Sequence, residues 1–158
     1  MLYLDSSALL KHYFQEPGTD AVNLKINEEL ATRQGIFVSV VGYSEIFATL
    51  SRLVRDDLLA KQEGDLLQQS FHDDWILKLS QVDLTADVLA FIPGLVNKHP
   101  LRGADAVHLA SALWLRETLR LRRSFGPTPG VLEFGTSDKQ LKTAAALEGL
   151  SFFDPQNP

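Results

Sequence analysis

The sequence predicts an α/β protein of three layers, in which helices cover both faces of a central parallel sheet. Short β-branched or aromatic runs alternate with longer segments that carry apolar residues at helical spacing along the 158 residues. Strands separated by helices pair in parallel, because a parallel pair needs the long crossover that a helix supplies. The sequence contains no internal repeat and no linker of biased composition. We therefore expect a single domain that spans residues 1–158.

Six elements are expected in the first half of the chain. In order, they are a strand at 1–5, helices at 6–14 and 19–32, a strand at 36–41, and helices at about 43–54 and 58–72. Pro17 and Gly18 end the first helix. The second helix is expected to use Ala21, Leu24 and Leu30 as its apolar positions.

The second half continues the alternation. In order, we expect a strand within 75–82, a helix at 85–97, the strongest helix at about 103–121, a strand at 131–136, a short helix to 147 and an apolar segment at 150–153. The Gly- and Pro-containing segment 124–130, SFGPTPG, is expected to be a loop.

Composition excludes several classes of function. The sequence has no Cys, which excludes disulfides, thiolate metal sites and Cys nucleophiles. No apolar run approaches the roughly 20 residues of a membrane span, so we expect a soluble, cytoplasmic protein with no membrane partner. The net charge of −5 falls to −1 when four candidate carboxylates are set aside, and a basic cluster is present at 116–123. Charge alone therefore does not decide whether nucleic acid is a partner.

Four acidic residues, each in a short motif, are the candidate functional residues. Asp5 closes MLYLD, Glu45 lies in VGYSEIFA, Asp105 in RGADAVHLA and Asp138 in FGTSD. Each acid alone could be a helix cap or a first-turn acid, and that structural alternative stays open. Together they predict a hard-metal site, because carboxylates brought close repel one another unless a cation neutralises them. Ligands in parallel α/β sheets bind outside the carboxyl ends of strands, where Asp5 and Asp138 are expected.

The strings LDSSALLK, SVVGYSEIFA, RGADAVHLASAL and GTSD stand in the order and at the approximate separations seen in PIN-domain ribonucleases. The chain resembles this family from residue 2 to about residue 153, and in particular the toxin subunit of VapBC-type toxin–antitoxin pairs. The resemblance implies a PIN-like sandwich. It also implies a site of four metal-binding, catalytic acids with two supporting hydroxyls: Asp5, Glu45, Asp105 and Asp138, with Ser7 and Thr136.

An all-oxygen site suits Mg²⁺ or Mn²⁺, as one or two ions. Such a site would hydrolyse an RNA phosphodiester by activating water and stabilising the leaving oxygen. The resemblance implies products with a 5′-phosphate and a 3′-hydroxyl. It further implies an RNA substrate, a cognate antitoxin protein and a homodimer.

Three other functions stay open at this point. The first is a phosphatase or phosphotransferase with Asp5 as its nucleophile, although dehalogenase-like proteins usually carry a second Asp where Ser7 stands. The second is a structure-specific DNA nuclease, and the third is a catalytically silent PIN scaffold that binds RNA or protein. The presence of all four acids speaks against the third.

Several other residues have two possible roles. His108 shares a helix face with Asp105 and is expected either to pack or hydrogen-bond beneath the site or to join a chelate. Aromatic residues could stack bases or belong to the core or an interface; these are Trp75, Trp114 and Phe125. Basic residues near the acidic motifs could contact phosphates or be solvated; these are Lys11, Arg52, Arg102 and Lys139.

Overall fold

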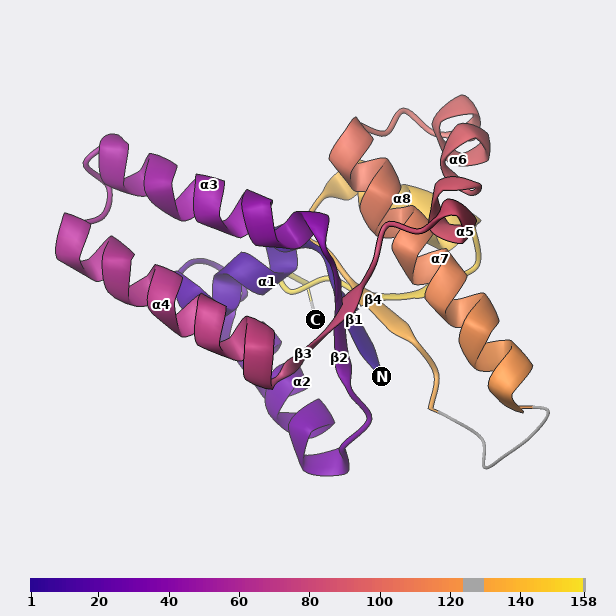
Figure 1. Cartoon of the computed structure of the whole chain (residues 1–158), viewed down its shortest axis with the longest axis horizontal. Coiled ribbons are helices and arrows are strands. Elements are labelled where there is room, and N and C mark those ends of the chain that lie inside the picture. Colours follow the sequence, from indigo (N-terminus) through magenta and orange to yellow (C-terminus); the bar gives the residue numbers. More distant parts are fainter. Residues whose placement is uncertain (124–129, 158) are drawn as a thin grey trace.

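A computed structural model describes residues 1–123 and 130–157 and confirms the three-layer sandwich with its parallel sheet. Five strands pair in parallel in the order β3-β2-β1-β4-β5. The strands are β1 (Leu2–Leu4), β2 (Ile36–Ser39), β3 (Leu79–Val82), β4 (Glu133–Gly135) and β5 (Ser151–Phe153). Figure 1 shows the sheet between two groups of helices. The predicted loop segment 124–129 and Phe125 lie outside the described residues.

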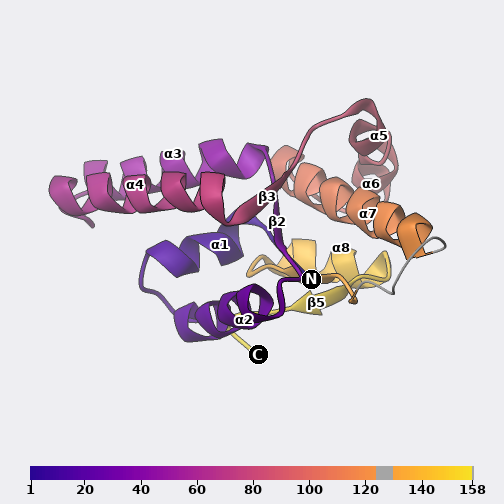
Figure 2. The ribbon, with the colours of Figure 1, turned by 60° about the horizontal axis from the view of Figure 1, so that its bottom comes forward.

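The first four helices cover one face of the sheet and the last four cover the other, as Figures 1 and 2 show from two directions. On the first face lie α1 (Ser6–Tyr13), α2 (Thr19–Thr32), α3 (Val41–Arg55) and α4 (Lys61–Leu77). On the second face lie α5 (Ala86–Leu89), α6 (Ile92–Lys98), α7 (Gly103–Arg123) and α8 (Lys139–Leu147).

The central strand β1 shows how the sequence divides the core. Leu2 and Leu4 pack against the first group of helices, whereas Tyr3 packs against the second. Successive side chains of a strand point to opposite faces, so a strand covered on both sides is apolar throughout. All three residues are fully buried.

Two of the predicted strands extended into residues that belong to helices. The strand predicted at 36–41 ends at Ser39, and α3 already begins at Val41. The strand predicted within 75–82 begins only at Leu79, because α4 continues to Leu77. Trp75 belongs to α4, where its ring packs against Phe71 one turn earlier and against Tyr43 of α3. This helical spacing of aromatic contacts outweighs the strand-like composition of the segment.

Two helix predictions were also wrong in detail. Leu24 and Leu30 of α2 are exposed, and the helix buries Val22 and Ile26 instead. The single helix predicted at 85–97 is divided into α5 and α6, with Pro93 in the first turn of α6. A proline there lacks the N–H that a continuous helix would need, so it starts a new helix.

Because all strands are parallel, their carboxyl ends lie at one edge of the sheet. Asp5 follows β1 directly, and the segment 136–138 follows β4. Helix α3 starts two residues after β2 and carries Glu45 near its beginning. Helix α7 carries Asp105 in its first turn and contacts β2, α3 and α8. This edge therefore collects the predicted site residues. None of the described helices is long and apolar enough to cross a membrane.

Candidate functional site

Asp5 is buried at the end of β1, and hydroxyl and amide donors surround its carboxylate. Its Oδ1 accepts the backbone N–H of Ala8 at 2.8 Å, so Asp5 caps α1. The Ser7 hydroxyl donates to the carboxylate at 2.8 Å, and the Thr136 hydroxyl donates to Oδ2 at 2.7 Å. Burial raises the pKa of Asp5 above its usual range, although His108 and these donors act in the opposite direction. The carboxylate is thus fixed in position at an electrostatic cost.

The segment after β4 is tied to Asp5 through the same two hydroxyls. Thr136 Oγ1 accepts the backbone N–H of Asp138 at 3.0 Å, and Ser7 Oγ accepts the backbone N–H of Ser137 at 3.0 Å. Asp138 in turn caps α8, since its Oδ1 accepts the backbone N–H of Leu141 at 2.7 Å. Asp5 and Asp138 are therefore helix caps, and the hydroxyls couple the positions of the two acids.

Glu45 is held by a buried histidine. Its Oε2 accepts a 2.6 Å hydrogen bond from the Ser6 hydroxyl and lies 2.7 Å from Nε2 of His108. The other ring nitrogen of His108 lies 3.2 Å from the Tyr3 hydroxyl. Burial raises the pKa of Glu45, but the hydrogen bonds from His108 and Ser6 outweigh it, so the pKa is lowered.

Asp105 is the least constrained of the four acids. Its Oδ2 accepts a 3.3 Å hydrogen bond from the backbone N–H of Arg102. Its own burial and the nearby charge of Asp138 raise the pKa of Asp105, and Glu45 adds to the rise. In the part of the chain that the structure describes, no Lys or Arg forms an ion pair with Asp5, Asp105 or Asp138.

The structure thus brings the four predicted acids to one edge and joins them in two groups. Asp5 and Asp138 share Thr136, whereas Glu45 is linked to His108, whose charge also acts on Asp5 and Asp105. Among residues 1–123 and 130–157, however, no three acidic or histidine side chains are arranged so as to hold a metal ion as they lie.

Two site residues were not predicted as such. Ser6, expected only as a cap of the first helix, bonds to Glu45. The hydroxyl of Ser137 is buried and has no hydrogen-bond partner among the described residues. Both residues could have been found from the sequence, because Ser and Thr residues stand directly beside two of the acids, in Asp5-Ser6-Ser7 and in Thr136-Ser137-Asp138.

The remaining candidates divide by burial. His108 is buried and hydrogen-bonded to Glu45, as the packing alternative expected. Trp75 and Trp114 are half-buried and pack against the core. Lys11 is buried in an ion pair with Glu16 and is therefore not a solvated surface residue. The other three basic candidates, Arg52, Arg102 and Lys139, are exposed.

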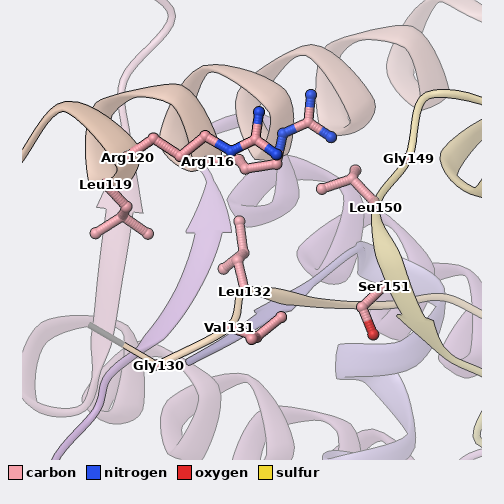
Figure 3. Close-up of a pocket in the computed structure, with 9 residues that line it drawn as sticks. All are labelled: Arg116, Leu119, Arg120, Gly130, Val131, Leu132, Gly149, Leu150 and Ser151. Atoms are coloured by element: carbon pink, nitrogen blue, oxygen red, sulfur yellow. The ribbon is translucent and has the colours of Figure 1, made fainter. Parts of the chain in front are cut away.

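The basic end of α7 lies away from the acids. Arg116 and Arg120 line a cavity with Leu132 and Ser151, near the amino ends of β4 and β5 (Figure 3). Its volume is about 210 Å³. Both guanidinium groups bond to Glu117, so their charge is partly neutralised within the helix. None of the four acids lines this cavity.

The fold is that of a known family. The family model of the PIN domain matches residues 2–125, and the chain therefore belongs to the PIN-domain family. Within it, the chain is similar to two curated proteins of Mycobacterium tuberculosis strains, Ribonuclease VapC45 and Ribonuclease VapC49. Each is 32% identical to it over 120 residues, which cover 72% of this chain and 75% of the relative.

Solved structures share the fold over 98–100% of the chain, and the matched part extends beyond the family model to β4, Asp138 and α8. VapBC2 from Rickettsia felis, bound to a DNA fragment from its promoter, has a TM-score of 0.64 at 16% identity and covers 98% of both chains. FitAcB from Neisseria gonorrhoeae has a TM-score of 0.66 at 14% identity and covers 100% of both chains. VapBC-1 from nontypeable Haemophilus influenzae has a TM-score of 0.61 at 12% identity, covering 99% of this chain and 100% of the other.

Proposed function

We propose that the chain is a metal-dependent endoribonuclease of the VapC type, the toxin component of a toxin–antitoxin pair. The observation that carries the proposal is the set of four acids at the carboxyl edge of the sheet, where Asp5, Asp105 and Asp138 have no basic partner among the described residues. The relatives named VapC ribonucleases favour RNA over DNA as the substrate and favour an enzyme over a silent scaffold. A phosphatase with Asp5 as nucleophile is disfavoured, because a buried carboxylate that accepts bonds from three residues is poorly placed to attack.

The chemistry of the donor set fits Mg²⁺ or Mn²⁺, as one or two ions. Carboxylate and hydroxyl oxygens are the ligands that these ions prefer. The raised pKa values of Asp5 and Asp105 mark negative charge that a cation would stabilise. The buried Ser137 hydroxyl, with no described partner, is a further oxygen beside the acids. When bound, the ions would lower the pKa of a water molecule and neutralise the leaving oxygen.

Each acid then has a role that its surroundings support. Asp5 and Asp105 would hold the principal ion, and Glu45 would help to position it. Asp138 would serve a second ion or the attacking water. Ser7 and Thr136 keep the Asp5 carboxylate in one orientation, and Ser6 and His108 do the same for Glu45. Outer hydrogen bonds of this kind reduce the reorganisation that ion binding requires.

The proposal includes partners. VapBC complexes are among the solved structures of the same fold, which supports a cognate antitoxin that binds this chain. We propose a homodimer and a cytoplasmic location with it, since the cytoplasm is where the proposed RNA substrate would be met.

Cleavage of RNA by the purified protein tests the central proposal. RNA and DNA of the same mixed sequence would be incubated with Mg²⁺, with Mn²⁺ or with EDTA, and the ends of the products mapped. We expect cleavage of RNA alone, dependent on the ion, with 5′-phosphate products, and cleavage slowed by about 10³-fold in the Asp5→Asn variant. Cleavage at an undiminished rate in EDTA or in Asp5→Asn would contradict the metal mechanism.

A further inference from the structure

A groove lies beside Asp138, between the segment that precedes α7 and helix α8. Its volume is about 410 Å³, within the range of small-ligand sites. Its lining residues are Lys98, His99 and Pro100 on one side and Lys139, Gln140, Thr143, Ala144 and Leu147 on the other. Lys139 directly follows Asp138, and Pro100 stands five residues before Asp105. The two segments that carry Asp105 and Asp138 therefore also form this groove.

Two exposed lysines flank the groove and give it a positive charge. Lys139 forms no ion pair within the described part of the chain. Lys98 is 66% exposed, and its contact with Glu148 is long, at 3.4 Å. Glu148 already accepts a shorter, 2.8 Å contact from His99, which lowers the pKa of the Glu148 carboxyl. In a chain of net charge −5, the ammonium group of Lys139 without an ion pair beside Asp138, and that of Lys98 held only at 3.4 Å, favour an anionic ligand in the groove.

The groove also offers an apolar surface and one adaptable polar group. Pro100 and Leu147 are exposed, and Leu147 has 71% of its surface accessible. Gln140 is exposed, and its side chain makes no hydrogen bond to the described residues. An amide can donate to and accept from the edge of a base. Lysines that can contact phosphates, with an apolar surface between them that a base can cover, match the chemistry of a nucleotide better than that of a simple anion.

We propose that this groove binds one nucleotide of single-stranded RNA next to the scissile phosphate. Lys98 and Lys139 contact its flanking phosphates, and the base lies against Pro100 and Leu147. This proposal rests on the proposed ribonuclease function. The substrate is single-stranded here because bases in a duplex are stacked and paired, so their faces cannot lie against Pro100 and Leu147.

The charge contribution is tested with a double variant, Lys98→Gln/Lys139→Gln, in the Asp5→Asn protein so that the RNA stays intact. The matched control is Arg55→Gln/Lys61→Gln, which removes the same charge from exposed positions near the α3–α4 turn. The probe is a fluorescein-labelled single-stranded octaribonucleotide of mixed sequence, followed by anisotropy at several salt concentrations. We expect about tenfold weaker binding and a salt slope lower by about 0.7 for each lost phosphate contact. The control is expected to bind as its parent does.

The occupancy of the groove is tested with Thr143→Trp, which fills it from an exposed position of α8. Ala146→Trp, on the same helix but outside the lining, is the control. With the catalytic acids intact, Thr143→Trp is expected to raise KM for RNA cleavage about tenfold and leave kcat within twofold. Circular dichroism and thermal melting establish that both variants fold.

The outcomes separate the two proposals. A wild-type protein that neither cleaves nor binds RNA would overturn the proposed function. A wild-type protein that cleaves RNA, with all groove variants equal to their controls, would overturn the groove proposal alone. Variants that weaken binding of an antitoxin peptide but not of RNA would make the groove a protein-binding site and would also overturn it.

Discussion

Asp5 and Asp105 are the same side chain in two different environments at one sheet edge. Asp5 is buried and accepts hydrogen bonds from Ser7, Ala8 and Thr136, whereas Asp105 is half-buried and accepts only one, from the Arg102 amide. Burial is the largest cause of the raised pKa in both, but a neighbouring carboxylate, Asp138, is the second cause only for Asp105. Hydrogen bonds fix the carboxylate of Asp5 in position, whereas the carboxylate of Asp105 lies loosely held near the like charge of Asp138.

The comparison indicates how such a site can be both precise and adaptable. A carboxylate fixed by several donors provides a position that does not change when a ligand arrives. A carboxylate with one long hydrogen bond can move toward an incoming cation. Asp105 is therefore the acid expected to shift most when an ion binds, and Asp5 the one expected to shift least.

The largest effect is expected for the fixed acid. Asp5→Asn is predicted to lower RNA cleavage by about 10³-fold, because several kcal/mol of transition-state stabilisation depend on the metal. Raising the Mn²⁺ concentration should not restore the rate, since the geometry itself is lost. Cleavage rates measured against Mn²⁺ check this. The metal-free melting temperature should stay level or rise, because Asn still caps α1 and a buried charge is removed.

The next effect concerns the histidine that holds Glu45. His108→Ala is predicted to weaken Mn²⁺ binding and to reduce cleavage by about 10–100-fold, the usual cost of removing an outer hydrogen-bond partner. His108→Gln, which keeps one donor, should retain part of both. Mn²⁺ affinity measured by electron paramagnetic resonance separates this effect from loss of folding. If both variants bind Mn²⁺ as the wild type does, His108 serves packing alone.

A smaller effect is expected for Asp138. Asp138→Asn is predicted to reduce cleavage about tenfold, with partial recovery at high Mn²⁺ concentration, because a weakened site can be refilled by mass action. Asn keeps the oxygen that caps α8, so stability should change little. A loss of cleavage as large as that of Asp5→Asn, and equally insensitive to Mn²⁺, would show that Asp138 is as essential as Asp5.

The smallest effect is one of pH on stability. The folded pKa of Asp5 is raised, so folded wild-type protein binds an additional proton as the pH falls through that pKa toward the unfolded value near 3.9. In EDTA, the melting temperature of the wild type should therefore rise relative to Asp5→Asn between pH 7 and pH 4. Each unit of pKa difference is about 1.4 kcal/mol, which corresponds to about 3–5 °C for a domain of this size. A relative fall over the same range would mean that the folded pKa is depressed.

Much of the fold followed from sequence because the strands and long helices had strong apolar patterns. The parallel sheet and the longest helix, α7, were predicted and confirmed. The boundary between α4 and β3 was not, because the contacts of Trp75 with Tyr43 and Phe71 exist only after tertiary packing. Leu24 and Leu30 were misassigned for the same reason: a helix with many apolar positions does not show which face will be covered.

The location of the acids was easier to predict than their surroundings. The rule that ligands bind at strand carboxyl ends placed Asp5 and Asp138, and the structure has both at that edge. The separate environments of Asp5 and Asp105 could not be predicted, because the Thr136 hydroxyl that fixes Asp5 is 131 residues away in the chain. Single-sequence patterns describe neighbours along the chain, whereas this hydrogen bond depends on strand order. The metal-binding roles themselves stay a prediction.

The central position of β1 also determines when the site can form during synthesis. Asp5 is translated before Thr136, which fixes its carboxylate and follows it by 131 residues, and before β4, which pairs with its strand. A nascent chain therefore carries a loose Asp5 until β4 has been translated and has inserted beside β1. For a protein proposed to cleave RNA, the site would therefore form only late in synthesis, so the nascent chain would not yet be active.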